Sequence, residues 1–248
     1  MEVIEFKDLN LKIKLTYFIN IIGKVSSGKT TLLKKIINKV TNGDLYIDGK
    51  SIISYDLDFK KRNLMVCLDD LKFNTSYVNE ELLYYQNILK TDSDLALENL
   101  KNFNEFFGLN EIMESKIESL PIRDKALIKI LSFLILNPSV LGIDNLLSYL
   151  SIEDKLKIIK YVKQNKISIL NVTSMAEELL LGTDIIVLED FKVISYESTK
   201  KTLNDDKMLL KIGFELPFTV SLSNGLNYYN LLSKKYYTNK SLVEAIWK

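Results

Sequence analysis

One segment near the N-terminus restricts the fold of this chain more than any other. Residues 23–30 read Gly-Lys-Val-Ser-Ser-Gly-Lys-Thr, which matches the phosphate-binding pattern of a glycine, four residues, and Gly-Lys before Ser or Thr. The apolar run 18–22 is typical of a buried strand, and residues 31–37 have the apolar spacing of a helix. Strand, glycine loop and helix in this order predict a phosphate-binding loop in an α/β protein. A glycine-rich turn that binds nothing is the alternative.

The residue types in this loop predict how it would hold a nucleotide. Backbone N–H groups and the helix N-terminus point at the phosphates, Lys29 reaches the outer phosphates, and the Thr30 hydroxyl ligates magnesium. The predicted nucleotide-binding residues are Gly23, Ser26, Ser27, Gly28, Lys29, Thr30 and Thr31.

A second candidate metal ligand lies far along the chain. Residues 140–144 form an apolar run that ends in Asp144. Phosphate-loop proteins place a second magnesium-binding carboxylate at the end of such a strand. We therefore predict that Asp144 and Thr30 hold one magnesium ion. The alternative is that Asp144 caps the next helix.

Composition restricts the class of protein. The 248 residues have a net charge of +1, with Lys and Arg interspersed among Asp and Glu, so nothing favours a nucleic-acid partner. The single cysteine, Cys67, excludes an internal disulfide framework and suits a reducing compartment. The first residues do not resemble a signal peptide. The most apolar stretch, 126–143, is interrupted by Lys129 and Asn137-Pro138, so we do not expect it to span a bilayer.

Hydrophobic periodicity predicts alternating strands and helices over the rest of the chain. Strands are expected at 8–13, 63–68, 140–144 and 167–172, with hairpins at 43–50 and at 184–188 with 192–196. Helices are expected in several pieces within 78–118, from Pro121 to residue 136, at 152–165 and at 175–181. A separate tail begins at about Glu197.

This order of elements resembles the ATPase subunit of ATP-binding cassette (ABC) transporters. The 43–50 hairpin is similar to the segment after the first helix in that family, and 138–144 is similar to its second nucleotide motif. Residues 209–218 and 238–247 are similar to the C-terminal extension of energy-coupling factor (vitamin-uptake) ATPases. The resemblance implies an α/β phosphate-loop NTPase of ABC type, with a mixed sheet, a helical subdomain at about 72–137 and a small C-terminal extension.

The same resemblance implies cofactors, partners and location. The expected cofactors are ATP and Mg²⁺. Residues 1–196 would form the nucleotide-binding domain, and residues 197–248 an extension available for dimerisation. The expected partners are a second ABC ATPase subunit, in a heterodimer, and a transmembrane transporter subunit. The chain would then be cytoplasmic and peripheral, held on the inner face of the cell membrane through its partner.

Several positions depart from the family's pattern. Asn145 stands where the family has a glutamate that polarises the attacking water, and an amide cannot accept that proton. The Leu-Ser-Gly-Gly-Gln signature falls on residues 120–124, Leu-Pro-Ile-Arg-Asp, where Asp124 brings a carboxylate towards a phosphate-binding surface and Arg123 offsets part of its charge. The switch histidine falls near Ser174, and the chain contains no histidine.

Other family positions are filled by residues of different chemistry. The glutamine that senses magnesium and water falls at or near Cys67. The neighbouring Asp69 and Asp70 either replace a lost carboxylate or face solvent. Tyr17 and Phe18 are candidates to stack on adenine, with Phe18 favoured as a core residue.

These departures favour nucleotide binding over hydrolysis. Loss of a general base or a water-orienting group typically lowers the rate by about 10² to 10⁴, whereas the loop, the lysine and the magnesium ligands of the binding motif are intact. The expected function is an ATP-binding subunit of an energy-coupling-factor-like importer, with weak or no hydrolysis and no assigned catalytic residue. The alternatives are a non-hydrolysing module in which ATP holds a complex together, and a soluble phosphate-loop kinase or GTPase.

Overall fold

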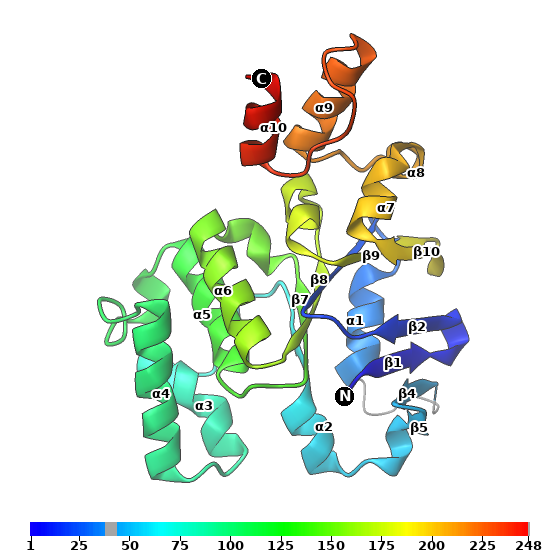
Figure 1. The fold of residues 1–248 in the computed structure, drawn as a ribbon. Coiled ribbons are helices and arrows are strands. Elements are labelled where there is room, and N and C mark those ends of the chain that lie inside the picture. Colours follow the sequence, from blue (N-terminus) through cyan, green and yellow to red (C-terminus); the bar gives the residue numbers. More distant parts are fainter. Residues whose placement is uncertain (38–43, 248) are drawn as a thin grey trace. The chain divides into compact units, whose positions relative to one another are not determined.

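The computed structural model describes residues 1–37 and 44–247, and the chain divides into two compact units. The first comprises Met1–Tyr17 and Thr30–Val172, and the second comprises Phe18–Lys29 and Thr173–Lys248. Each unit combines strands with helices, so the chain has the α/β class expected from its sequence (Figure 1).

An antiparallel sheet in the first unit has the strand order β2-β1-β4-β5. Its strands are β1 (Val3–Phe6), β2 (Leu11–Lys14), β4 (Leu45–Ile47) and β5 (Lys50–Ser51). The hairpin predicted at residues 43–50 is confirmed over its described part, where β4 pairs antiparallel with β5, while Gly43 lies outside the described residues. The strand predicted from Asp8 begins only at Leu11, because Lys7–Leu9 form a 3₁₀ turn that Asn10 closes in the left-handed conformation.

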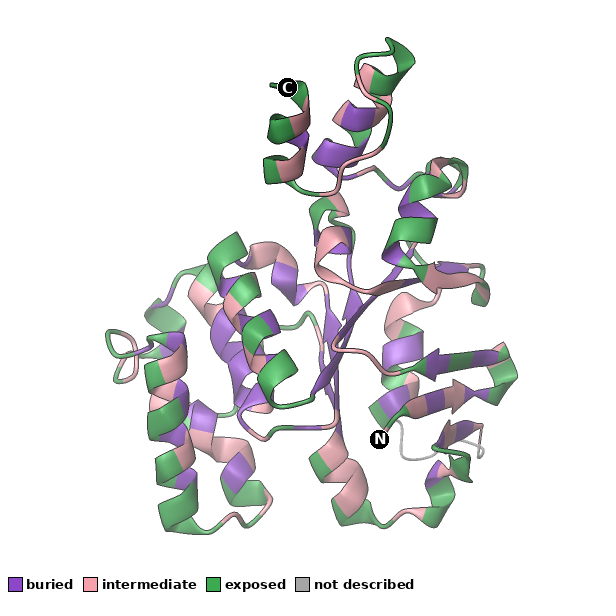
Figure 2. Cartoon of the chain, viewed as in Figure 1, coloured by how far each residue is buried: buried purple, intermediate pink, exposed green. Residues whose placement is uncertain are grey.

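Parallel strands form the centre of the first unit. The order is β6 (Leu64–Cys67), β7 (Val140–Asp144) and β8 (Ser168–Val172), with β7 pairing to both neighbours. Every residue of these strands is buried, as expected for parallel strands covered on both faces (Figure 2). Because parallel strands end at one edge, Cys67 and Asp144 lie at the same edge of this part of the sheet.

Helices of the first unit lie where the sequence predicted them, except for α2, for which no helix was predicted. They are α1 (Lys29–Ile37, with Lys29 counted in the second unit), α2 (Leu57–Asn63), α3 (Val78–Ile88), α4 (Ser93–Phe107), α5 (Ile122–Leu134) and α6 (Ile152–Gln164). Asp92 caps the N-terminus of α4, and Gly108 ends it in the left-handed conformation. Tyr85 of α3 packs on Phe133 of the largely buried α5, with ring centroids 4.7 Å apart.

The second unit contains the strand that leads into the phosphate loop. β3 (Phe18–Gly23) runs parallel to β9 (Asp184–Glu189), and β9 pairs antiparallel with β10 (Lys192–Ser198), so this part of the sheet is mixed. The predicted helix at 175–181 is a 3₁₀ helix, η5 (Ala176–Leu181). Four α-helices follow: α7 (Thr199–Asn204), α8 (Asp206–Lys211), α9 (Phe218–Tyr228) and α10 (Asn239–Ile246).

The tail shares a hydrophobic core with the strands of its own unit. This core comprises Ile22, Leu179, Ile185, Val187, Leu203, Leu209, Ile212, Phe214 and Val220. Side chains after residue 197 therefore belong to the same hydrophobic core as Ile22 of the strand that ends at the phosphate loop. Among the described residues, no helix has the length and apolar character needed to cross a membrane.

Candidate functional site

The phosphate loop begins where β3 ends, and its glycines are required by the space around them. A Cβ atom added to Gly23 would lie 2.2 Å from the carbonyl oxygen of Leu188. Gly28 has a φ of +99°, and a Cβ there would lie 2.8 Å from the ring of Phe191. Both positions therefore exclude larger residues, and the backbone of the loop stays open to a phosphate.

Lys29 is held by the loop itself. Its Nζ donates hydrogen bonds to the carbonyl oxygens of Gly23, at 2.8 Å, and Lys24, at 2.7 Å. These bonds fix the ammonium against the loop backbone. A phosphate bound to the loop would therefore meet a positive charge already in place.

A buried hydroxyl in the loop lacks a hydrogen-bond partner. Ser27 is only 3% exposed, and its Oγ has no hydrogen bond to any described residue. Leaving a buried polar group unpaired costs about 1–3 kcal/mol. Together with the glycine positions and Lys29, this unpaired hydroxyl makes the loop a good fit for a phosphate group.

The structure brings Thr30 and Asp144 together within the first unit. The Thr30 hydroxyl donates a 2.7 Å hydrogen bond to Oδ2 of Asp144, which ends β7 and is 8% exposed. The next turn, η4 (Leu146–Tyr149), begins at Asn145 without a side-chain cap, so Asp144 does not cap it. A hydroxyl and a carboxylate are oxygen ligands of the kind that Mg²⁺ prefers. The metal role of the pair stays a prediction.

The family's glutamate position is predicted to fall on Asn145, and its histidine position near Ser174. Asn145 has a φ of 55°; its N–H donates to the Val172 carbonyl at 2.9 Å, and its carbonyl accepts from the Ser148 hydroxyl at 2.6 Å. Ser174 is exposed on the stretch that follows β8. Neither side chain is a base at neutral pH, so the structure places no general base at either position.

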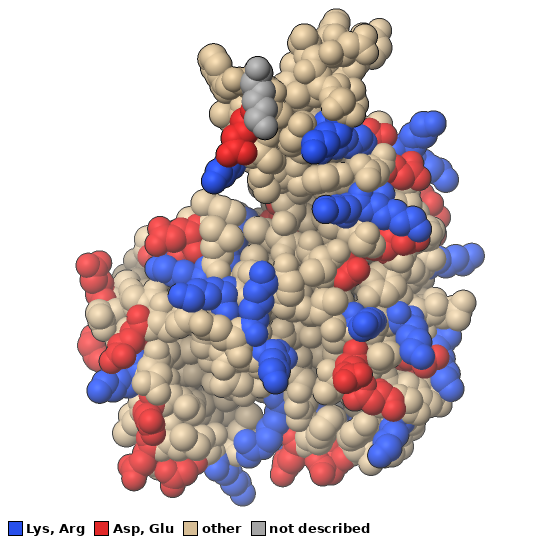
Figure 3. Space-filling model, viewed as in Figure 1, with Lys and Arg blue, Asp and Glu red and all other residues tan. Residues whose placement is uncertain are grey.

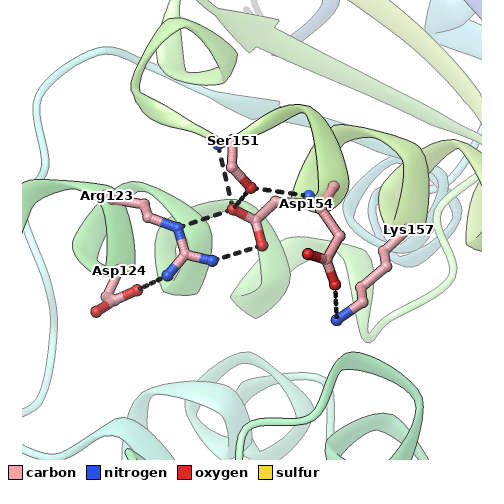
Figure 4. A network of polar contacts seen from close by, with 6 residues as sticks. Arg123, Asp124, Ser151, Asp154 and Lys157 are labelled. Carbon is pink, nitrogen blue, oxygen red and sulfur yellow. Dashed lines mark hydrogen bonds and ion pairs between the residues drawn. The ribbon is translucent and has the colours of Figure 1, made fainter.

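The segment in place of the signature is organised by Arg123 at the start of α5 (Figure 4). Its Nε and Nη2 donate to the two carboxylate oxygens of Asp154, at 2.9 and 2.7 Å, and its Nη1 donates to Asp124 at 2.8 Å. The expectation that Arg123 offsets the charge of Asp124 is confirmed. The guanidinium is shared between two carboxylates.

Asp154 also completes the N-terminal cap of α6. The Ser151 hydroxyl accepts from the Asp154 N–H, and the Asp154 carboxylate accepts from the Ser151 N–H, which forms a capping box. Burial favours a higher pKa for Asp154, but hydrogen bonds from Ser151 and Arg123 outweigh it, so the pKa lies below its usual value. Asp154 is therefore ionised at neutral pH.

Cys67 is the residue predicted to lie at or near the position of the family's glutamine. The thiol is fully buried, donates to the carbonyl of Lys129 at 3.5 Å, and has its pKa raised by burial. Asp70, one of the two carboxylates that follow, lies 3.9 Å from the ammonium of Lys129, and Asp69 is exposed. The Asp70 carboxylate is therefore already close to a cation of its own unit.

The two candidate stacking aromatics differ in their surroundings. Phe18 is fully buried, which confirms the core position favoured for it. Tyr17 is partly exposed, and the ammonium of Lys163 lies 4.1 Å from the centre of its ring.

Two features of the structure have no signal in the sequence. One is a pocket of about 730 Å³ in the first unit, lined in part by Phe73, Tyr77, Ile122 and Lys125. The other is the position of Phe191 beside Gly28. Both depend on residues far apart in the chain, so local pattern does not predict them.

Comparison with known proteins identifies relatives over nearly the whole chain. Residues 6–148 match the ABC transporter family. The energy-coupling factor transporter ATP-binding protein EcfA1 of Streptococcus sanguinis is 23% identical, with 97% of this chain and 89% of that protein covered. EcfA of Pediococcus pentosaceus is 26% identical over 88% of this chain and 81% of that protein.

Solved structures show the same fold. CbiO1 from Clostridium perfringens, part of the ABC transporter complex cbiONQ, has a TM-score of 0.73 at 18% identity, with 90% of this chain and 99% of that chain covered. A bacterial Atm1-family ABC exporter with ATP bound has a TM-score of 0.70 at 14% identity, covering 83% of this chain and 38% of that one. The predicted fold class is confirmed.

Proposed function

The chain belongs to the ABC transporter family, and we propose that it is the ATP-binding subunit of a membrane importer of the energy-coupling factor type. The observation that carries the proposal is the intact phosphate loop, with Lys29 fixed against its backbone. Its relatives over nearly the full length are energy-coupling factor ATP-binding proteins, which supports the class of transporter.

Mg²⁺-ATP fits the residues that are present. The backbone of residues 26–31 and Lys29 would hold the phosphates, and the buried Ser27 hydroxyl is available to them. Thr30 and Asp144 would hold the magnesium ion, which neutralises phosphate charge when bound.

Weak or absent hydrolysis is part of the proposal. Asn145 offers no base to the attacking water, and the chain has no histidine to supply one. By resemblance, the Asp124 carboxylate would lie where the family presents a phosphate-binding loop, and Arg123 offsets part of its charge. Asn145 also favours the second candidate function, a module in which bound ATP holds a complex together without turnover.

The proposed partners are a second ATPase subunit, in a heterodimer, and a transmembrane subunit that holds this chain on the inner face of the membrane. Exposed apolar side chains in the tail support a contact between ATPase subunits: Tyr228 of α9 is 82% exposed, and Trp247 after α10 is 85% exposed. Figure 3 shows the region of α9 as mainly uncharged, whereas Lys and Arg are interspersed with Asp and Glu over much of the drawn face. The pocket beside Ile122 offers an apolar surface with nearby lysines to the transmembrane subunit.

Calorimetric titration of the purified chain with ATP, with and without Mg²⁺, tests the binding step. We expect magnesium-dependent binding that Lys29→Ala abolishes, because the substitution removes the cation of the loop. Failure of the wild-type chain to bind ATP would contradict the proposal.

Phosphate release, measured alone and with the co-purified partner subunits, separates the two candidate functions. Magnesium-dependent turnover that Lys29→Ala abolishes would exclude the non-hydrolysing module. A sharp rise in turnover for Asn145→Glu would support the loss of a base as the cause of weak hydrolysis. An unchanged rate in a variant that still binds ATP would count against that cause.

A further inference from the structure

The turn between β9 and β10 has an unusual backbone. Glu189 pairs with Lys192, so Asp190 and Phe191 alone form the turn, with φ angles of 47° and 61°. A two-residue hairpin with positive φ at both positions favours Asn-Gly or Asp-Gly. A bulky residue in this conformation is an outlier, and such strain persists only where the surroundings determine it.

The surroundings of Phe191 are the phosphate loop of the same unit. Its N–H donates to the carbonyl of Ser27 at 3.0 Å, and its ring leaves no space for a Cβ on Gly28. The carboxylate of Glu189, on the same hairpin, lies 3.5 Å from the ammonium of Lys24. The hairpin therefore contacts the loop through a hydrogen bond, a ring and an ion pair.

Burial alone does not explain why the strain is tolerated. The Phe191 side chain remains exposed, at 60% for the residue, so it gains little from the hydrophobic core. The ring instead lies beside Gly28. The wide backbone freedom of glycine raises the entropy cost of ordering the loop.

We propose that Phe191 is a positioning residue that holds the phosphate loop in its nucleotide-binding conformation before nucleotide arrives. The ring restricts Gly28, and the N–H fixes the carbonyl of Ser27. A loop ordered in advance loses less entropy on binding, which raises affinity and slows release. The effect on nucleotide rests on the proposed function, whereas the effect on the loop does not.

Phe191→Gly tests the role directly. Glycine keeps the N–H and adopts positive φ without strain, so the substitution removes the side chain and the strain but keeps the hydrogen bond to Ser27. In the nucleotide-free protein, we expect faster hydrogen exchange at the amides of residues 26–28. We expect the affinities for ATP and ADP to fall about tenfold, because binding must then order one more residue. The midpoint of thermal unfolding should not fall. Phe191→Tyr keeps the ring and should behave like the wild type.

Lys166→Gly is the matched control. Lys166 is exposed, has a φ of 56° and lies between α6 and β8 in the first unit, so glycine relieves the same kind of strain away from the loop. We expect this variant to leave loop exchange and nucleotide affinity unchanged.

Unchanged exchange at residues 26–28 in Phe191→Gly would overturn the proposal. Faster exchange throughout the second unit with a lower midpoint would also overturn it, since Phe191 would then only stabilise the fold. A wild-type chain that binds no ATP would defeat the proposed function, and the exchange comparison would still decide whether Phe191 orders the loop.

Discussion

The hydroxyl of Thr30, in the first turn of α1, donates a 2.7 Å hydrogen bond to Asp144 at the end of β7. The two residues are 114 positions apart in the chain. Their contact brings a hydroxyl oxygen and a carboxylate together at the last residue of the phosphate-loop motif. The pair has the chemistry of a magnesium site, and its contribution to ATP binding can be measured.

Thr30→Val and Asp144→Asn should weaken ATP binding only when magnesium is present. Thr30→Val removes the hydroxyl ligand, and Asp144→Asn removes the negative charge of the carboxylate. We therefore expect the affinity for Mg²⁺-ATP to fall about tenfold or more. Affinity in EDTA should change little. Lys34→Gln, at an exposed position further along α1, is the control. Equal losses with magnesium and in EDTA would show that the pair shapes the loop and does not hold the metal.

Arg123→Ala should destabilise the first unit by about 1–3 kcal/mol. The substitution leaves the Asp154 side chain, which is only 6% exposed, without its cation, while the 49% exposure of Arg123 limits the loss. Urea unfolding measures the change in free energy. Lys157→Ala breaks the more exposed pair with Glu153 and should cost less than about 0.5 kcal/mol. Equal costs for the two variants would contradict this assignment.

The stabilisation that comes from ionised Asp154 should disappear in acid. Its pKa is lower in the folded chain than in the unfolded chain, so the unfolded state binds the proton more readily. The advantage of the wild type over Asp154→Asn should be complete above about pH 4, the ordinary range for Asp. It should shrink as the pH falls through the lower folded pKa. Urea unfolding at a series of pH values measures this difference, and an advantage independent of pH would refute the prediction.

The Cys67 thiol should be unreactive in the folded protein. Burial excludes reagents and raises the pKa of the thiol, so little thiolate is present at neutral pH. Labelling with a chromogenic disulfide should be slow in buffer and fast in denaturant. Ser174→Cys adds a thiol at an exposed position and supplies the fast-reacting comparison. Rapid labelling of native wild-type protein would show that β6 opens readily.

Elements set by local pattern were predictable from the sequence. The apolar runs of β3 and β7 and the proline before α5 produced the strands and the helix expected of them. One strand prediction was wrong where a polar residue adopts a left-handed conformation. The alternation from Asp8 predicted a longer strand, but β2 begins only after the left-handed Asn10. The short segment 176–181 forms a 3₁₀ helix, a distinction that apolar spacing over so few residues does not resolve.

By itself, the sequence determined the phosphate-loop motif, the α/β order of elements and the absence of any histidine, because these depend on residue identity and short spacings. Only the tertiary structure decided that Thr30 contacts Asp144, that Arg123 is shared between Asp124 and Asp154, and that Phe191 lies on Gly28. Most of these contacts join segments far apart in the chain. The bond between Arg123 and the adjacent Asp124 also depends on the orientation of the Arg123 side chain, which the distant Asp154 helps to fix. Packing of whole strands and helices sets such distances, and no local pattern contains them.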